Sequence, residues 1–165
     1  MIYIKYLILI AVSLVLSFLD ISFFSFLDVY GATLLSSFIF LIIFTFVDKT
    51  KKDYIIVALS LVLSFSIFSS LPLFPIFINF FFIPAMISYL RRYYLPQPSL
   101  IVSVLYFLAT TFIFEGVLLI YAKAWNNSGL LTFSWFIFIN TVLGIIAYAF
   151  YLKVRRKFKT FEIKI

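Results

Sequence analysis

Long uninterrupted apolar runs restrict what this chain can fold into more than any other feature. From Tyr54 to Leu90 the sequence has no charged residue, and such a stretch is too long for a single membrane crossing at about 1.5 Å of rise per residue. Apolar runs of about 18 or more residues with few charges are typical of membrane-spanning helices. Hydrophobic residues make up 65% of the chain and charged residues 12%, whereas soluble domains have about 45–50% and about 25%. The sequence therefore predicts an integral membrane protein.

Charge runs and prolines divide the chain into six apolar segments. Pro72 and Pro75 interrupt the longest run, because proline lacks the N–H that a helix needs and restricts the residue before it. No small-x-small cleavage site precedes Asp20, so we expect the first segment to remain as an uncleaved helix. The predicted fold class is all-α, a polytopic membrane bundle of six transmembrane helices at about residues 2–19, 30–47, 54–71, 73–90, 99–122 and 130–152, followed by a basic cytoplasmic tail at 153–165.

The positions of lysine and arginine predict the orientation of this bundle. Short loops rich in these residues stay preferentially on the cytoplasmic side of a membrane. With the N-terminus inside, all of the 13 Lys and Arg residues except Lys123 fall in inner segments or in the tail. We therefore expect both termini in the cytoplasm. The stretch 21–27, between Asp20 and Asp28, is then expected to lie along the outer surface of the membrane.

The composition leaves little of the chemistry that enzymes use. The chain contains no Cys and no His, which excludes disulfides, thiolate nucleophiles, imidazole bases and the usual zinc and haem ligands. The chain has only six acidic residues and four glycines. Its sequence contains no glycine-rich phosphate-binding motif and no Ser/His/Asp set. We expect neither an enzyme nor a protein that needs a metal or another cofactor.

The formal net charge of +7 is explained by the bias of basic residues toward the inner side, so we expect no nucleic acid as a partner. A cluster of basic residues follows the last predicted helix, and basic residues near a membrane surface attract anionic lipid headgroups. Membrane lipids are therefore expected partners. The residues of this cytoplasmic basic anchor are Lys153, Arg155, Arg156, Lys157 and Lys159.

Four polar residues inside predicted helices are candidates for intramembrane contacts. Glu115 is the one acidic residue well inside a predicted helix, where a carboxylate is costly unless it faces the bundle interior, a cavity or a partner helix. Thr111 lies one turn earlier on the same face and could donate a hydrogen bond to it. Asn79 and Asn140 carry amides, which often bond between membrane helices. Each of the four is either a ligand or partner contact or a structural clamp, and Pro84 is expected to kink the fourth helix.

Small residues recur at four-residue spacing in two of the predicted helices, as the pairs Ser13/Ser17, Ser60/Ser64 and Ser66/Ser70. This spacing places both members of a pair on one helix face and allows a neighbouring helix to approach closely. We interpret these pairs as helix-contact positions.

The last predicted helix and the tail, FINTVLGIIAYAFYLKVRRKF at 138–158, have an Asn early in the helix, then a small-residue step and a basic exit. This pattern resembles the end of the bacterial rod shape-determining MreD family, and 67–119 is similar to the middle of that family, with Glu115 where many members have an acidic residue. The family's Gly-x-x-x-Asp-like motif is absent from 61–69. The resemblance implies a non-enzymatic scaffold of the peptidoglycan-synthesising cell-elongation machinery in the bacterial cytoplasmic membrane. Its implied partners are MreC within the membrane, MreB filaments, and RodA with its transpeptidase.

The alternative is the substrate-binding S component of an energy-coupling-factor (ECF) vitamin transporter, or another small membrane transporter. S components are similar in size and fold and typically carry Ala-xxx-Ala on the first helix, whereas here Ala11 is followed by Val15. A vitamin site needs several convergent polar groups on the outer side. The sequence offers few of them: Asp20, Asp28, Trp125, Asn126 and Asn127.

Overall fold

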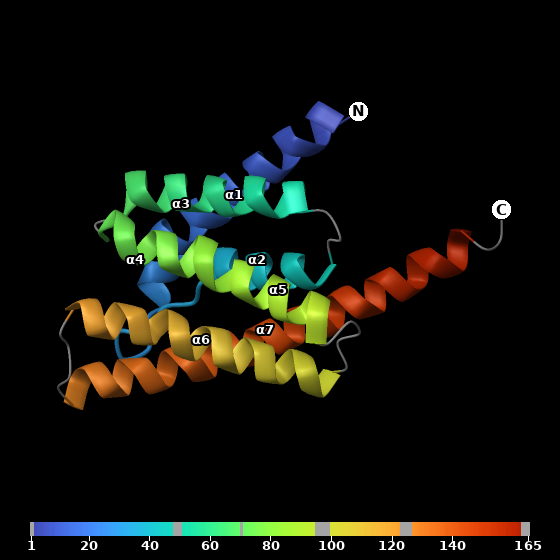
Figure 1. The fold of residues 1–165 in the computed structure, drawn as a ribbon. Helices are drawn as coiled ribbons and strands as arrows, with labels where there is room; N and C mark the ends of the chain where they lie inside the picture. Colours follow the sequence, from blue (N-terminus) through green and yellow to red (C-terminus); the bar gives the residue numbers. More distant parts are fainter. Residues whose placement is uncertain (1, 48–50, 70, 95–99, 123–126, 163–165) are drawn as a thin grey trace.

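The computed structural model describes residues 2–47, 51–69, 71–94, 100–122 and 127–162, and this part of the chain is a bundle of helices joined by short connections (Figure 1). A 3-10 turn, η1, and a π-helical turn, η2, accompany the α-helices. The elements are α1 (Ile2–Ser22), η1 (Phe24–Leu27), α2 (Ser36–Val47), α3 (Lys51–Phe68), α4 (Leu73–Phe77), η2 (Ile78–Phe82), α5 (Ile83–Tyr94), α6 (Leu100–Ala122) and α7 (Asn127–Glu162).

Helix length and composition make this a membrane protein. Within the described ranges, four helical stretches are long and apolar enough to cross a bilayer. The apolar parts of α2 and α3 are shorter, at Ser36–Thr45 and Asp53–Phe68. The four long stretches are Tyr3–Ser22, Leu73–Leu90, Ile101–Ala122 and Gly129–Val154.

The second helix begins six residues later than predicted, at Ser36 rather than at residue 30. Tyr30 and Gly31 both have positive φ, at 54° and 80°, a conformation that turns the chain and cannot start a right-handed helix. Val29 and Ala32 exchange two backbone hydrogen bonds of 3.0 Å across this turn. The predicted second helix is therefore a turn and an extended segment at 28–35, followed by a short helix.

The fourth predicted helix is continuous from α4 through η2 to α5, and Pro84 changes its winding. Pro84 has no N–H to donate and its ring would collide with the carbonyl one turn earlier. The preceding residues Ile78–Phe82 are wound as a π-helix, with the N–H of Ile83 bonded to the carbonyl of Ile78. The wider turn gives the ring room. Pro75 lies in the first turn of α4, where its missing N–H costs nothing, so Pro72 alone marks the break.

The last helix runs from Asn127 to Glu162, so the predicted tail at 153–165 is not a separate segment but continues α7 through Glu162. The residues that follow Leu152 include no Gly or Pro, and Lys, Arg and Glu are good helix formers. Both chain ends lie toward the same end of the bundle (Figure 1).

Helices α1 and α3 pack along each other. Ser13, Ser17 and Ser64 are buried, and each hydroxyl donates to a carbonyl one turn earlier in its own helix. Small side chains with internally satisfied hydroxyls let two helices approach in an apolar medium. Lys5 and Asp53 form an ion pair between the first turns of these helices.

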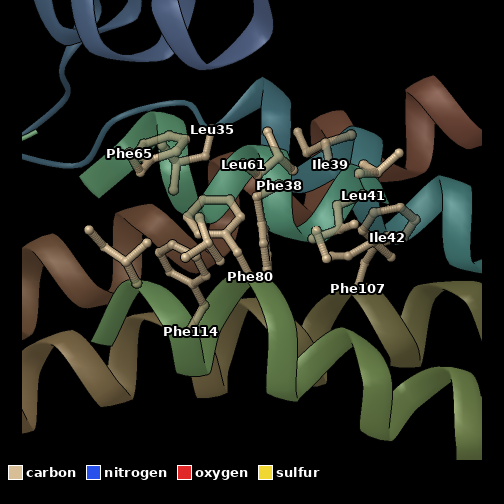
Figure 2. Packing of buried hydrophobic residues seen from close by; sticks show 14 of the residues in the cluster. Leu35, Phe38, Ile39, Leu41, Ile42, Leu61, Phe65, Phe80, Phe107 and Phe114 are labelled. Atoms are coloured by element: carbon tan, nitrogen blue, oxygen red, sulfur yellow. The ribbon is translucent and has the colours of Figure 1, made fainter. Parts of the chain in front are cut away.

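Stacked and edge-on aromatic rings fill the centre of the bundle (Figure 2). Phe38 of α2 lies 4.4 Å from Phe114 of α6 and 6.3 Å from Phe80 of η2, measured between ring centroids. Phe65 of α3 stacks on Phe80 at 4.6 Å, and Phe136 of α7 stacks on Phe114 at 5.5 Å. These rings link five elements into one core.

Candidate functional site

Asp20, predicted to lie at the outer surface, is buried at the end of α1 with 3% of its surface exposed. Its carboxylate accepts hydrogen bonds from the backbone N–H groups of Ser36 and Ser37, at 2.7 and 2.9 Å, and from both hydroxyls. The first N–H groups of a helix have no partner within the helix. Asp20, which belongs to α1, accepts hydrogen bonds from two of these N–H groups of α2. Its negative charge also lies at the favourable, positive end of the helix dipole.

Asn140 of α7 holds the segment just before α2. Its Oδ1 accepts a hydrogen bond from Leu35 N at 2.9 Å, and its Nδ2 donates to Thr33 O at 3.0 Å and to Phe136 O at 3.1 Å. An unpaired backbone group costs several kcal/mol in a bilayer. Asn140 therefore acts within this chain as a clamp, which is one of the two roles open for it from the sequence.

The turn at 28–32 is held by two further contacts. The hydroxyl of Thr132 donates to the carbonyl of Tyr30 at 2.7 Å, and Asp28 accepts from Gly31 N at 3.2 Å. The Tyr30 ring stacks on Trp135 of α7 with centroids 5.8 Å apart. Together with Asp20 and Asn140, these contacts satisfy the non-helical backbone that precedes α2.

A shallow, open hollow lies on the surface of α7 and is lined by Ser134, Trp135 and Phe138. Trp135 also stacks edge-on against Phe138, with centroids 5.9 Å apart. The Ser134 hydroxyl donates to Leu130 O in its own helix. The hollow is mainly apolar and lies beside the Tyr30 ring that stacks on Trp135. Apart from its aromatic residues, no pattern in the sequence predicts it.

Asn79 lies in the π-turn with 1% of its surface exposed. Its Nδ2 donates to Phe114 O of α6 at 3.2 Å, while its Oδ1 is buried and has no hydrogen-bond partner among the residues that the structure describes. The hydroxyl of Tyr54 in α3 donates to Phe81 O in the π-turn. This contact joins residues 27 positions apart and depends on tertiary structure.

Thr111 is fully buried, and its hydroxyl bonds to Thr141 of α7 at 3.0 Å and to carbonyls of α6. The expected hydrogen bond from Thr111 to Glu115 is not formed. Glu115 is half-buried and makes no hydrogen bond or ion pair with the residues that the structure describes. The four predicted intramembrane residues thus divide into clamps, which are Thr111, Asn140 and the Asn79 amide nitrogen, and one carboxyl without a partner.

The basic anchor is only partly described. Lys153 is exposed, and the side chains of Arg155, Arg156, Lys157 and Lys159 lie outside the description, although these residues fall within α7. Of the outer polar residues considered for a vitamin site, Trp125 and Asn126 also lie outside it, and Asn127 begins α7.

The described side chains bring together no group of three His, Cys, Asp or Glu residues that could hold a metal ion. The arrangement instead consists of hydrogen-bond clamps around α2, a π-turn at Pro84 and a partnerless carboxyl on α6. Sequence reasoning missed the role of Asp20, because the signal for it, two serines at the start of a short helix, was assigned to the middle of a longer helix. Comparison of the chain with protein-family models, with curated proteins and with solved structures finds no match.

Proposed function

We propose that this chain is a non-enzymatic scaffold of the cell-elongation machinery in the bacterial cytoplasmic membrane, where it binds an MreC-like single-pass protein. The observation that carries the proposal is the use of the buried polar groups. Asp20, Thr111 and Asn140 each form hydrogen bonds within the chain. Satisfied internal networks fix one shape and leave these groups closed to a substrate. With the resemblance of 138–158 to the MreD family, this favours a protein that holds other proteins.

We also infer six membrane crossings with both termini inside the cell. The ion pair between Lys5 and Asp53 supports this topology, because it puts the starts of α1 and α3 at one end of the bundle. The hydrogen bond from Thr132 to Tyr30 puts the turn before α2 beside the start of α7. Helices that alternate in this way agree with the distribution of Lys and Arg.

Single-cysteine labelling tests the topology cleanly, since the chain has no native Cys. An impermeant thiol reagent should label cysteines at positions 28 and 127 in intact cells, replacing Asp28 and Asn127. Cysteines replacing Lys51, Tyr93 and Arg156 should react only after the membrane is opened. Labelling of position 51 in intact cells would show that the topology is wrong.

Depletion and co-purification test the function. Loss of the protein should turn rod-shaped cells round, and purification in mild detergent should recover an MreC-like single-pass protein. Normal cell shape after depletion, together with no recovered partner, contradicts the scaffold.

The hollow beside Trp135 favours a second candidate, the S component of an ECF-type vitamin transporter, because it lies near the turn that we place on the outer side. Vitamins would then quench the fluorescence of Trp135, and Trp135→Phe would remove that signal while leaving Trp125 as an internal control. Saturable quenching, combined with vitamin uptake that is lost on depletion, would move the assignment to transport.

A further inference from the structure

The acidic residues with described side chains differ in what they contact. Asp20 accepts four hydrogen bonds, Asp28 accepts one from a backbone N–H, and Asp53 pairs with Lys5. Glu115 has no such contact with any described residue. A carboxyl group inside a membrane helix is costly and is normally paired, so Glu115 calls for a hydrogen-bond donor that the described chain does not supply.

The position of Glu115 keeps it away from water. It lies about two turns before the end of α6 at Ala122, which is roughly 10 Å along the helix axis. That distance exceeds the reach of a glutamate side chain, so the carboxyl cannot simply extend to the membrane surface as a longer side chain does. The donor must therefore come to Glu115 at that depth.

Contacts on either side locate Glu115 along the edge where α6 meets α7. One turn earlier, Thr111 bonds to Thr141 of α7, and the preceding residue, Phe114, stacks on Phe136. Because residues one turn apart share a face, Glu115 lies toward the α7 side of α6. Its partial exposure leaves it open at the edge of this pair rather than enclosed.

The hollow on α7 lies at the same level. Helices α6 and α7 run antiparallel, with Thr111 paired to Thr141, so a step of one turn beyond Thr111 corresponds to a step of one turn before Thr141. That step reaches 137–138, and Phe138 lines one end of the hollow, while Ser134 lies one turn further along. Ser134 lies seven positions before Thr141 and so on the same side of α7. Glu115 and the hollow thus form one surface on the α6–α7 pair.

We propose that this surface, the α6–α7 face, binds a transmembrane helix of a partner protein, which places a hydrogen-bond donor on Glu115 and a bulky apolar side chain in the hollow. The donor is the side chain of Asn, Gln, Ser, Thr or a basic residue at the depth of Glu115. The exposed rings of Phe112 and Phe138 supply apolar contact around it. An interhelical hydrogen bond of this kind contributes modestly to the association of helices in a bilayer.

Hydrogen-bond complementarity to Glu115 favours a partner helix over lipid and over a second copy of this chain. Lipid acyl chains carry no donor, and headgroups lie about two turns away from Glu115. A second copy whose two-fold axis passed through Glu115 would present another carboxyl group, which in its charged form only accepts hydrogen bonds. A helix that carries a donor at this depth satisfies the charged carboxyl directly.

This inference rests on the proposed scaffold function, and in-cell photo-crosslinking separates the two. A benzophenone amino acid would replace Phe112, Ser134 or Phe138 in turn, and the matched control would replace Leu63, an exposed residue of α3. The first three positions should give one adduct with the single-pass partner that co-purifies, and position 63 should give none. Mass spectrometry should map the adduct to a transmembrane segment with a donor residue.

The role of Glu115 is tested in the same strain. Glu115→Leu should lower the adduct yield at position 134 about 3- to 15-fold, which is the range for an interhelical hydrogen bond, whereas Glu115→Gln keeps an acceptor and should stay within about 2-fold. Replacing the mapped donor by Leu should match the Glu115→Leu loss. Equal thermal stability of both variants in detergent excludes misfolding as the cause.

Three results overturn the inference. An adduct of twice the chain mass would identify a second copy as the occupant. A partner that co-purifies but crosslinks only from position 63, or with a yield that Glu115→Leu leaves unchanged, would refute the α6–α7 face while the scaffold function stands. Failure to recover any partner would overturn both.

Discussion

Gly144 provides the sharpest test of how α6 and α7 pack. A Cβ placed on Gly144 would lie 2.5 Å from Cδ1 and Cε1 of the Phe107 ring and 3.1 Å from its Cγ. Phe107 is fully buried, so its ring has no open space to move into. Gly144→Ala should therefore force α6 and α7 apart or twist the ring out of its rotamer.

The magnitude follows from a comparison with Gly116, where an added Cβ meets nothing within 4 Å. Adding a methyl group to a filled core typically costs about 1–3 kcal/mol. Alanine is also a better helix former than glycine by about 1 kcal/mol, but this gain applies equally to both positions and cancels in the comparison. Gly144→Ala should be less stable than Gly116→Ala by about 1–3 kcal/mol, and Gly116→Ala should match or exceed the original chain.

Reversible unfolding by SDS in mixed micelles, followed by circular dichroism, gives the free energies of unfolding. Phe107→Leu combined with Gly144→Ala should recover part of the loss, with a coupling energy of about 1 kcal/mol or more, because the smaller side chain makes room for the methyl group. Equal stability of Gly144→Ala and Gly116→Ala would refute the close contact between Gly144 and Phe107.

Three further substitutions test the clamps by the same unfolding assay. Asp20→Ala should lower the free energy of unfolding by about 2 kcal/mol or more, since it strips the start of α2 of its acceptor, while Asp28→Ala, at an exposed site, should cost less than about 1 kcal/mol; equal losses would contradict the capping role. Asn140→Leu should cost about 1–3 kcal/mol and should raise the labelling rate of a cysteine placed at position 33, and an unchanged rate would count against the clamp. Tyr54→Phe should cost about 1 kcal/mol by removing the hydrogen bond to Phe81 O, and the loss should exceed that of a Tyr→Phe change at the exposed position 89.

The helical class and membrane character could be predicted because they depend on composition and on the spacing of charges. Helix ends were less accessible wherever a tertiary contact decides them. The stretch 30–47 has no charged residue, and the local signals that separate its turn from its helix are only Gly31 and the serines at 36 and 37. The start of α2 at Ser36 depends on Asp20 and on Asn140, which lie far away in the sequence.

Pro84 illustrates the same limit in a different way. Its sequence position predicted a local distortion, and the helix does change its winding there. The form of the distortion is a π-turn over Ile78–Phe82, and the hydroxyl of Tyr54 from α3 donates to the carbonyl of Phe81 within it. A local rule identifies where a helix must yield, whereas the surrounding helices determine how.

Asp20 and Glu115 carry the contrast that matters most for function. Asp20 lies where a short helix begins, and the fold uses all of its capacity: α2 could not begin inside the bundle without an acceptor for its first N–H groups. Glu115 lies on a regular helix whose backbone is already satisfied, so the described fold gains nothing from its charge. For a residue that costs stability in the membrane and satisfies no internal group, we propose a contact outside the described chain. This difference, rather than acidity alone, is why Glu115 and not Asp20 marks the surface on which a partner would bind.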